Sequence, residues 1–187
     1  MQRIAHITAL AALALATASA VRAQEAPEAP KPTKEHAWLK QFVGQWDSKS
    51  EARFAPDQPA VTCQGTMNSR MLGEFWIVSD LEGGFEGARI KAIQTIGYDP
   101  GKKKYVGTWI DSMFNHLWRY EGTVDESGKI LTLEAEGPDF VMPGKTALFR
   151  DSYEFKSPDL IVATSSARGD DGKWVQFMTG EIRRKRP

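Results

Sequence analysis

The stretch "WLKQFVGQW", residues 38–46, places a run with helical spacing directly before a Gly-x-Trp sequence. Thr33 is a suitable N-cap and Gly44 is a typical helix stop, so the pattern predicts one short helix over residues 34–42. Gly44 and Trp46 then open the first β-strand. Two tryptophans at this junction are expected to plug one end of a closed barrel, where large rings fill the space that the strands enclose.

Ten segments of alternating polarity follow the helix, and they are separated by turn sequences such as APDQP, DPGKK, DESGK and GDDGK. Strands joined by short turns predict an all-β antiparallel meander, which closes into a barrel because closure removes exposed edges. Side chains just fill the interior of a barrel of about eight strands. A barrel of ten strands is therefore expected to hold a cavity unless aromatic rings fill it. The segments are residues 45–54, 61–71, 74–81, 88–99, 104–113, 116–125, 129–136, 145–156, 159–168 and 173–184.

The N-terminal sequence predicts export. Residues 1–23 combine a basic start, a short apolar run and small residues that suit cleavage after Ala20 or Ala23, the pattern of a secretory signal peptide. The apolar run is shorter than the roughly 20 residues of a membrane-spanning helix, so no membrane span is expected. Residues 24–33 predict a disordered linker, and residues 34–187 predict a single barrel domain in the periplasm or outside the cell.

The composition excludes several classes of partner and site. The chain of 187 residues has 24 basic and 24 acidic side chains, so nothing in its charge favours binding to nucleic acid. Cys63 is the only cysteine, which rules out an intramolecular disulfide. With His36 and His116 the only histidines after the leader, no zinc or other metal site is expected. His36 is expected to face solvent on the helix.

Alternation along the strands predicts which side chains face the interior. Arg119 and Glu121 share one face of their segment, and this face should meet water. The opposite face then points inward. The same reasoning applied to neighbouring segments predicts an aromatic-rich ligand-binding set of Trp109, Asp111, Met113, His116, Trp118, Tyr120, Phe149, Asp151 and Tyr153.

Asp111 and His116 are expected to be neighbours across a two-residue hairpin turn at one mouth of the barrel. A carboxylate beside an imidazole can anchor a ligand, act with Tyr120 in acid–base chemistry, or simply stabilise the hairpin. No G-x-S-x-G sequence supplies a nucleophile. The inward carboxylate of Asp151 also needs a partner, and Tyr120, Arg183 and a ligand are the candidates.

The helix followed by Gly44 and Trp46 resembles the entrance of calycin-type barrels, which include lipocalins, fatty-acid-binding proteins and nitrobindins. This resemblance implies that Trp46 lies across the closed end and that Arg183 or Arg184, in "GEIRRKR", packs over its ring. The nitrobindin comparison also implies a haem option, for which His116 is the only inward histidine. No other cofactor is expected.

Three sequences, "EHAWLKQFVGQW", "GEFWIVSDLEG" and "GYDPGKKKYVGTWIDSM", resemble the bacterial family catalogued as domain of unknown function 1579. The resemblance covers about residues 34–184, and the GYDP-x-x-x-KY-x-x-x-WID run is specific because it combines a turn with two strand edges in a fixed order. It implies calycin-like closure and supplies no mechanism.

Three functions are consistent with these patterns. The first is binding of a small apolar molecule inside the barrel, and the second is an enzyme that uses Asp111 and His116. The third is a filled barrel with a structural or interaction role. The loop "GPDFVMPG" carries Phe140, Val141 and Met142, which are expected to form a lid, contact a partner or fold back over the mouth. The sequence specifies neither the ligand nor an oligomeric state.

Overall fold

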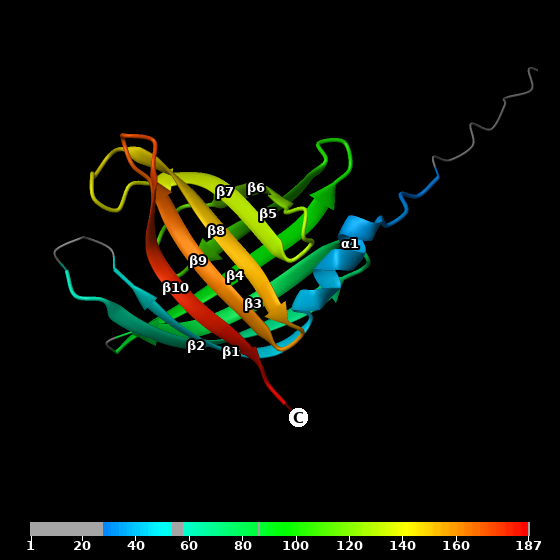
Figure 1. The fold of residues 1–187 in the computed structure, drawn as a ribbon, viewed down its shortest axis with the longest axis horizontal. Coiled ribbons are helices and arrows are strands. Elements are labelled where there is room, and N and C mark those ends of the chain that lie inside the picture. Colours follow the sequence, from blue (N-terminus) through cyan, green and yellow to red (C-terminus); the bar gives the residue numbers. More distant parts are fainter. Residues whose placement is uncertain (1–27, 54–57, 86, 187) are drawn as a thin grey trace, which may run out of the picture. The chain divides into compact units, whose positions relative to one another are not determined.

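The computed structural model describes residues 28–53, 58–85 and 87–186. The expected signal peptide and the first residues of the expected linker therefore lie outside the described residues. Pro32–Pro187 form a compact unit built on a closed antiparallel barrel of ten strands, with a short helix at one end (Figure 1). The predicted all-β class and barrel closure are confirmed.

The strands follow one another around the barrel in chain order, each antiparallel to the next. β1 pairs with both β2 and β10, so Trp46 of β1 lies between Met67 of β2 and Arg184 of β10. This last pairing closes the cylinder. The strands are β1 (Gly44–Ala52), β2 (Val61–Leu72), β3 (Trp76–Phe85), β4 (Ala88–Asp99), β5 (Lys104–Asp111), β6 (Trp118–Val124), β7 (Ile130–Pro138), β8 (Thr146–Ser157), β9 (Leu160–Arg168) and β10 (Trp174–Arg184).

The helix begins after Thr33, as predicted, and consists of α1 (Lys34–Trp38) followed by the 3-10 helix η1 (Leu39–Phe42). The sequence predicted that His36 faces solvent, and this prediction is wrong. His36 is buried because it takes part in the helix cap. Its Nδ1 atom accepts a hydrogen bond from the Thr33 backbone N–H at 3.0 Å, and its side chain is buried against two aromatic rings. In the described part of the chain, no helix is both long and apolar enough to cross a bilayer.

Trp46 is fully buried where the helix meets the first strand. Its Nε1–H donates a hydrogen bond to the backbone oxygen of Phe42 at 2.8 Å, which ties the end of η1 to β1. Of the two candidate arginines, Arg184 covers the indole, with its Cζ atom 3.9 Å from the ring centre. Arg183 lies on the opposite face of β10 and pairs with the exposed Glu181.

The helix-side half of the barrel interior is filled by side chains. Trp38 packs edge-to-face against Phe42 and Phe155, and its Nε1–H donates to the backbone oxygen of Gly128 at 2.8 Å. These contacts hold the helix against the end of the barrel. Fully buried aliphatic side chains complete this half: Leu39, Ile77, Ile96, Leu131, Leu133 and Ile161.

The hairpin between β5 and β6 differs from the prediction. β5 ends at Asp111 and β6 begins at Trp118, so a loop of residues 112–117 replaces the expected two-residue turn. The Asp111 carboxylate accepts hydrogen bonds from the backbone N–H groups of Met113 at 2.7 Å and Phe114 at 2.9 Å. These bonds turn the chain away from β5 and end the strand early.

Candidate functional site

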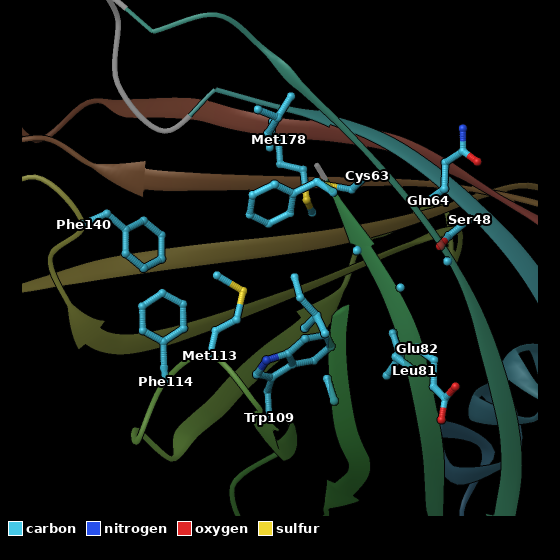
Figure 2. A pocket seen from close by; sticks show the side chains of 18 of the residues that line it. Ser48, Cys63, Gln64, Leu81, Glu82, Trp109, Met113, Phe114, Phe140 and Met178 are labelled. Atoms are coloured by element: carbon cyan, nitrogen blue, oxygen red, sulfur yellow. The ribbon is translucent and has the colours of Figure 1, made fainter. Parts of the chain in front are cut away.

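A cavity of about 730 Å³ lies at the barrel end opposite the helix. Its walls come from β1 to β5 and β10, and the loops that follow β5 and β7 contribute to its rim (Figure 2). Most of the exposed lining is apolar. The wall includes Ala52, Val61, Cys63, Leu81, Ile90, Ala92, Trp109 and Met178, and the rim includes Met113, Phe114 and Phe140.

A smaller space of about 200 Å³, here called the inner chamber, adjoins this cavity. The two spaces lie side by side, because four residues line both of them: Trp109, Phe114, Phe140 and Met178. Polar side chains make up a larger share of the lining in the chamber than in the main cavity. Its other lining residues are Asp111, Trp118, Tyr120, Phe149, Asp151, Tyr153, Ser165 and Phe177.

Most side chains of the predicted ligand-binding set meet in the inner chamber. The exceptions are Met113 and His116. Met113 lies at the rim of the main cavity and is 50% exposed. His116 lines neither space, because its ring packs edge-on against Trp118 with ring centres 4.9 Å apart. The members that line the chamber are Trp109, Asp111, Trp118, Tyr120, Phe149, Asp151 and Tyr153.

Asp151 forms the centre of a hydroxyl–carboxylate network in the chamber. The Tyr120 hydroxyl donates to its Oδ2 atom at 2.5 Å, and the Ser165 hydroxyl donates to its Oδ1 atom at 2.6 Å. Burial raises the pKa of the Asp151 carboxyl group, although both hydrogen bonds oppose this change. Burial and the nearby Asp151 charge also raise the pKa of Tyr120, which keeps its hydroxyl protonated as a donor.

A second polar pair lies beside this network. The Gln94 amide, 2% exposed, donates to the Tyr153 hydroxyl at 2.9 Å. Burial is the main reason that the pKa of Tyr153 rises, with a smaller contribution from Asp151. The pair joins β4 to β8 across the interior of the barrel. Tyr153 also lines the inner chamber, so this hydrogen bond fixes its position in the chamber wall.

Asp111 and His116 do not form the expected pair. The Asp111 carboxylate accepts a hydrogen bond from Trp109 Nε1 at 2.8 Å, in addition to its two backbone bonds. His116 Nε2 lies 3.1 Å from the backbone oxygen of Glu136. Each group therefore has its own partners, and the early end of β5 is the physical reason that the two side chains are not brought together.

The same geometry bears on the haem option. A haem ligand in a barrel would be an imidazole directed into an open apolar pocket. The His116 ring is directed at the Glu136 carbonyl and lines neither the cavity nor the chamber. The described residues do not fit a haem iron at this position. Nowhere among them do three His, Cys, Asp or Glu side chains gather to hold a metal ion.

Phe140 closes part of the rim. Its ring stacks on Phe114 with ring centres 5.6 Å apart (Figure 2). The ring centre of Phe140 also lies 4.8 Å from that of Phe149. The loop between β7 and β8 therefore folds back over the mouth through Phe140. The next residue, Val141, is 66% exposed.

Some lining residues could not be found by alternation. β10 contains a bulge between Gln176 and Met178, and the extra residue lets the consecutive Phe177 and Met178 both line the chamber. Ser165 lies four residues after Ile161 in β9, so the two side chains point to the same, inward face of the strand. Alternation applied to this strand would therefore have identified Ser165 as a lining residue.

Solved protein structures share this fold at low sequence identity. The S-type phycobiliprotein lyase CPES from Guillardia theta aligns with a TM-score of 0.56 and 16% identity, over 81% of this chain and 93% of that chain. Rv2717c from M. tuberculosis aligns with a TM-score of 0.61 and 11% identity, over 83% of this chain and 100% of that chain. At such identities the likeness concerns the fold. None of the curated proteins matches the sequence.

A family profile gives a more direct relationship. Residues 31–184 match the family described as protein of unknown function (DUF1579). The match spans the helix and all ten strands of the barrel, and it agrees with the resemblance seen in the sequence. The chain therefore belongs to the DUF1579 family.

Proposed function

We propose that this protein binds one small, largely apolar molecule in the cavity and the inner chamber. The observation that carries this proposal is an apolar-walled space of about 730 Å³ at the open end of the barrel. Ligand pockets in proteins typically have volumes of about 300 to 1,000 Å³, with mostly apolar walls and a few polar groups that fix orientation. The cavity has this make-up.

The alternative of a filled barrel has less support. A structural role gives no reason to leave apolar space empty, because each unfilled volume forfeits packing contacts. The enzymatic alternative also lacks support, since Asp111 and His116 have separate partners. The likeness to phycobiliprotein lyase concerns the fold, so the binding proposal rests on the cavity itself.

Tryptophan fluorescence tests the proposal, because Trp109 and Trp118 line the chamber. Titration with apolar probes such as retinol and decanol is expected to shift or quench the emission with saturation. Ala92→Phe should weaken binding at least about tenfold, because Ala92 lines the cavity and a ring there occupies ligand space. Ile93→Phe is the matched control, since Ile93 is the next residue and is 42% exposed.

Two outcomes would overturn the proposal. One is wild-type emission that no apolar probe changes. The other is equal probe affinity for the Ala92→Phe and Ile93→Phe variants, which would place binding outside the cavity.

We also propose that the chain is exported and loses its leader. The support is the signal-peptide pattern of residues 1–23. The test is to express the full chain in a bacterium and to sequence the N-terminus of the protein from the periplasm and the medium. A start at Val21 or Gln24 is expected. Intact chain that is confined to the cytoplasm would contradict export.

A further inference from the structure

The inner chamber combines carboxylates with aromatic rings and lacks basic groups. Asp151 lies among the rings of Trp109, Trp118, Tyr120 and other aromatic residues. Within the described chain, no residue that lines the cavity or the chamber is Lys, Arg or His. A ligand group that reaches the chamber therefore meets negative charge and the electron-rich faces of aromatic rings.

The other carboxylates around this space already have strong partners. Asp111 accepts three N–H hydrogen bonds, and Asp139 accepts two from the backbone of its own loop. Glu82, at the edge of the cavity, forms a salt bridge with Lys91 at 2.9 Å. Asp151 differs from all three, because its partners are the hydroxyl groups of Tyr120 and Ser165.

Asp151 consequently has unused capacity to accept hydrogen bonds. A carboxylate has about four acceptor positions, and the two hydroxyl donors use one on each oxygen. None of the salt bridges of the described residues includes Asp151. A carboxylate held deep in a protein without a positive partner is electrostatically unfavourable, and its raised pKa reflects this situation. A cationic group from a ligand would supply the missing partner.

We propose that the ligand is an amphiphilic amine, with its apolar body in the main cavity and its protonated amino group beside Asp151 in the inner chamber. This inference rests on the proposed function. The ammonium group would donate hydrogen bonds to the Asp151 oxygens, and the surrounding rings would stabilise its charge by cation–π interaction. A chamber of about 200 Å³ accepts such a head group and is too small for a drug-sized body.

The same site would discriminate against anionic amphiphiles. A fatty-acid carboxylate in the chamber would face the Asp151 carboxylate at short range, where little water screens the repulsion. A hydroxyl head group would donate one hydrogen bond without supplying charge. The expected order of affinity is therefore amine, then alcohol, then carboxylate, at constant chain length.

The test compares decylamine, decanol and decanoate on the wild-type protein at neutral pH, below their micelle-forming concentrations, with tryptophan emission as the signal. Decylamine is expected to bind at least about tenfold more tightly than decanol, as for a hydrogen bond between charged groups in place of a neutral one. Decanoate is expected to bind most weakly. This comparison needs no variant, so it does not depend on whether a substituted protein folds.

Asp151→Asn then tests the residue. The variant is expected to lose at least about tenfold in decylamine affinity while its decanol affinity stays within about threefold. Glu154→Gln removes the same charge from the outer face of the same strand, β8, and should leave both affinities unchanged, because Glu154 lines neither space and is paired with Lys156. Thermal unfolding of both variants checks that they are folded.

The outcomes separate the two proposals. If none of the three probes changes the emission, binding of apolar molecules itself is wrong. If decanol or decanoate binds as tightly as decylamine, or if Asp151→Asn binds decylamine like the wild type, the cavity binds ligands but the amine inference is wrong.

Discussion

The guanidinium carbon of Arg184 lies 3.9 Å from the centre of the Trp46 ring, so a residue of the last strand covers a residue of the first. The same guanidinium donates hydrogen bonds to the backbone oxygens of Val43 at 2.6 Å and Gln41 at 3.1 Å. One side chain thus connects β10, β1 and the end of η1. The closed end of the barrel depends on this connection.

Replacing Arg184 is expected to destabilise the protein strongly. Arg184→Met keeps much of the aliphatic stem but loses the cation–π contact and the hydrogen bonds, which should lower the free energy of unfolding by about 2 kcal/mol or more. Arg183→Met is the control, because Arg183 forms an exposed pair with Glu181 and should change stability by less than about 0.5 kcal/mol. Urea denaturation measures both. Equal effects would contradict the role assigned to Arg184.

Gly44 is expected to tolerate no side chain. Its φ of +131° is a conformation that L-residues rarely adopt, and a Cβ atom there would lie 2.5 Å from Arg184 Nη1. Gly44→Ala should lower stability by about 2 kcal/mol or more, because it adds a collision to backbone strain. Gly73 has a φ of +61° but open space around it, so Gly73→Ala should cost only about 1 kcal/mol. A smaller loss at Gly44 than at Gly73 would refute this account.

The Gln94–Tyr153 pair is expected to show coupling in a double-mutant cycle. Tyr153→Phe leaves the buried Gln94 amide without the acceptor it has now, which should cost about 1 to 3 kcal/mol. Gln94→Met removes the amide and keeps its approximate volume. The double variant should be more stable than the sum of the single effects predicts, by about 1 kcal/mol. Strict additivity in chemical denaturation would mean that the hydrogen bond contributes nothing.

Asp151 is expected to make stability depend on pH in an identifiable direction. Burial raises its pKa in the folded protein above the ordinary carboxyl value, so the unfolded chain releases this proton first as the pH rises. The stabilising contribution of the protonated group is complete below the unfolded pKa and is lost as the pH rises through the folded pKa. Asp151→Asn cannot titrate at this position.

The measurement is the difference in unfolding free energy between wild type and Asp151→Asn, from urea denaturation across mildly acidic to neutral pH. The difference should move in favour of the variant as the pH rises. Asp111 is present in both proteins and cancels, and the neighbouring Tyr120 and Tyr153 stay protonated because their pKa values are raised. A difference that is constant, or that moves the other way, would show that the folded pKa is not raised.

Much of the fold could be predicted because its determinants are local. Period-two alternation and turn residues gave the number and order of strands, and Thr33 and Gly44 marked the limits of the helix. His36 was placed wrongly because its burial depends on a cap bond to the Thr33 backbone. The loop at residues 112–117 was missed for a similar reason, since the Asp111 carboxylate binds backbone groups beyond the strand.

The chamber was only partly predictable. Parity indicates which face of a strand is inward, and it brought Trp118, Tyr120 and Asp151 together. It does not indicate the depth of a side chain in the barrel, because depth depends on the register between strands. The bulge in β10 breaks parity at Phe177, and whether side chains fill the space can be judged only when all ten registers are known.

The pairing of β1 with β10 has a kinetic consequence. The strand made early in synthesis bonds along its length to the strand made last, so the ring stays open while the intervening strands are being translated. Contacts between positions so far apart in sequence form slowly, because a long loop must first be ordered. A polypeptide with this topology cannot close its barrel until β10 has left the ribosome.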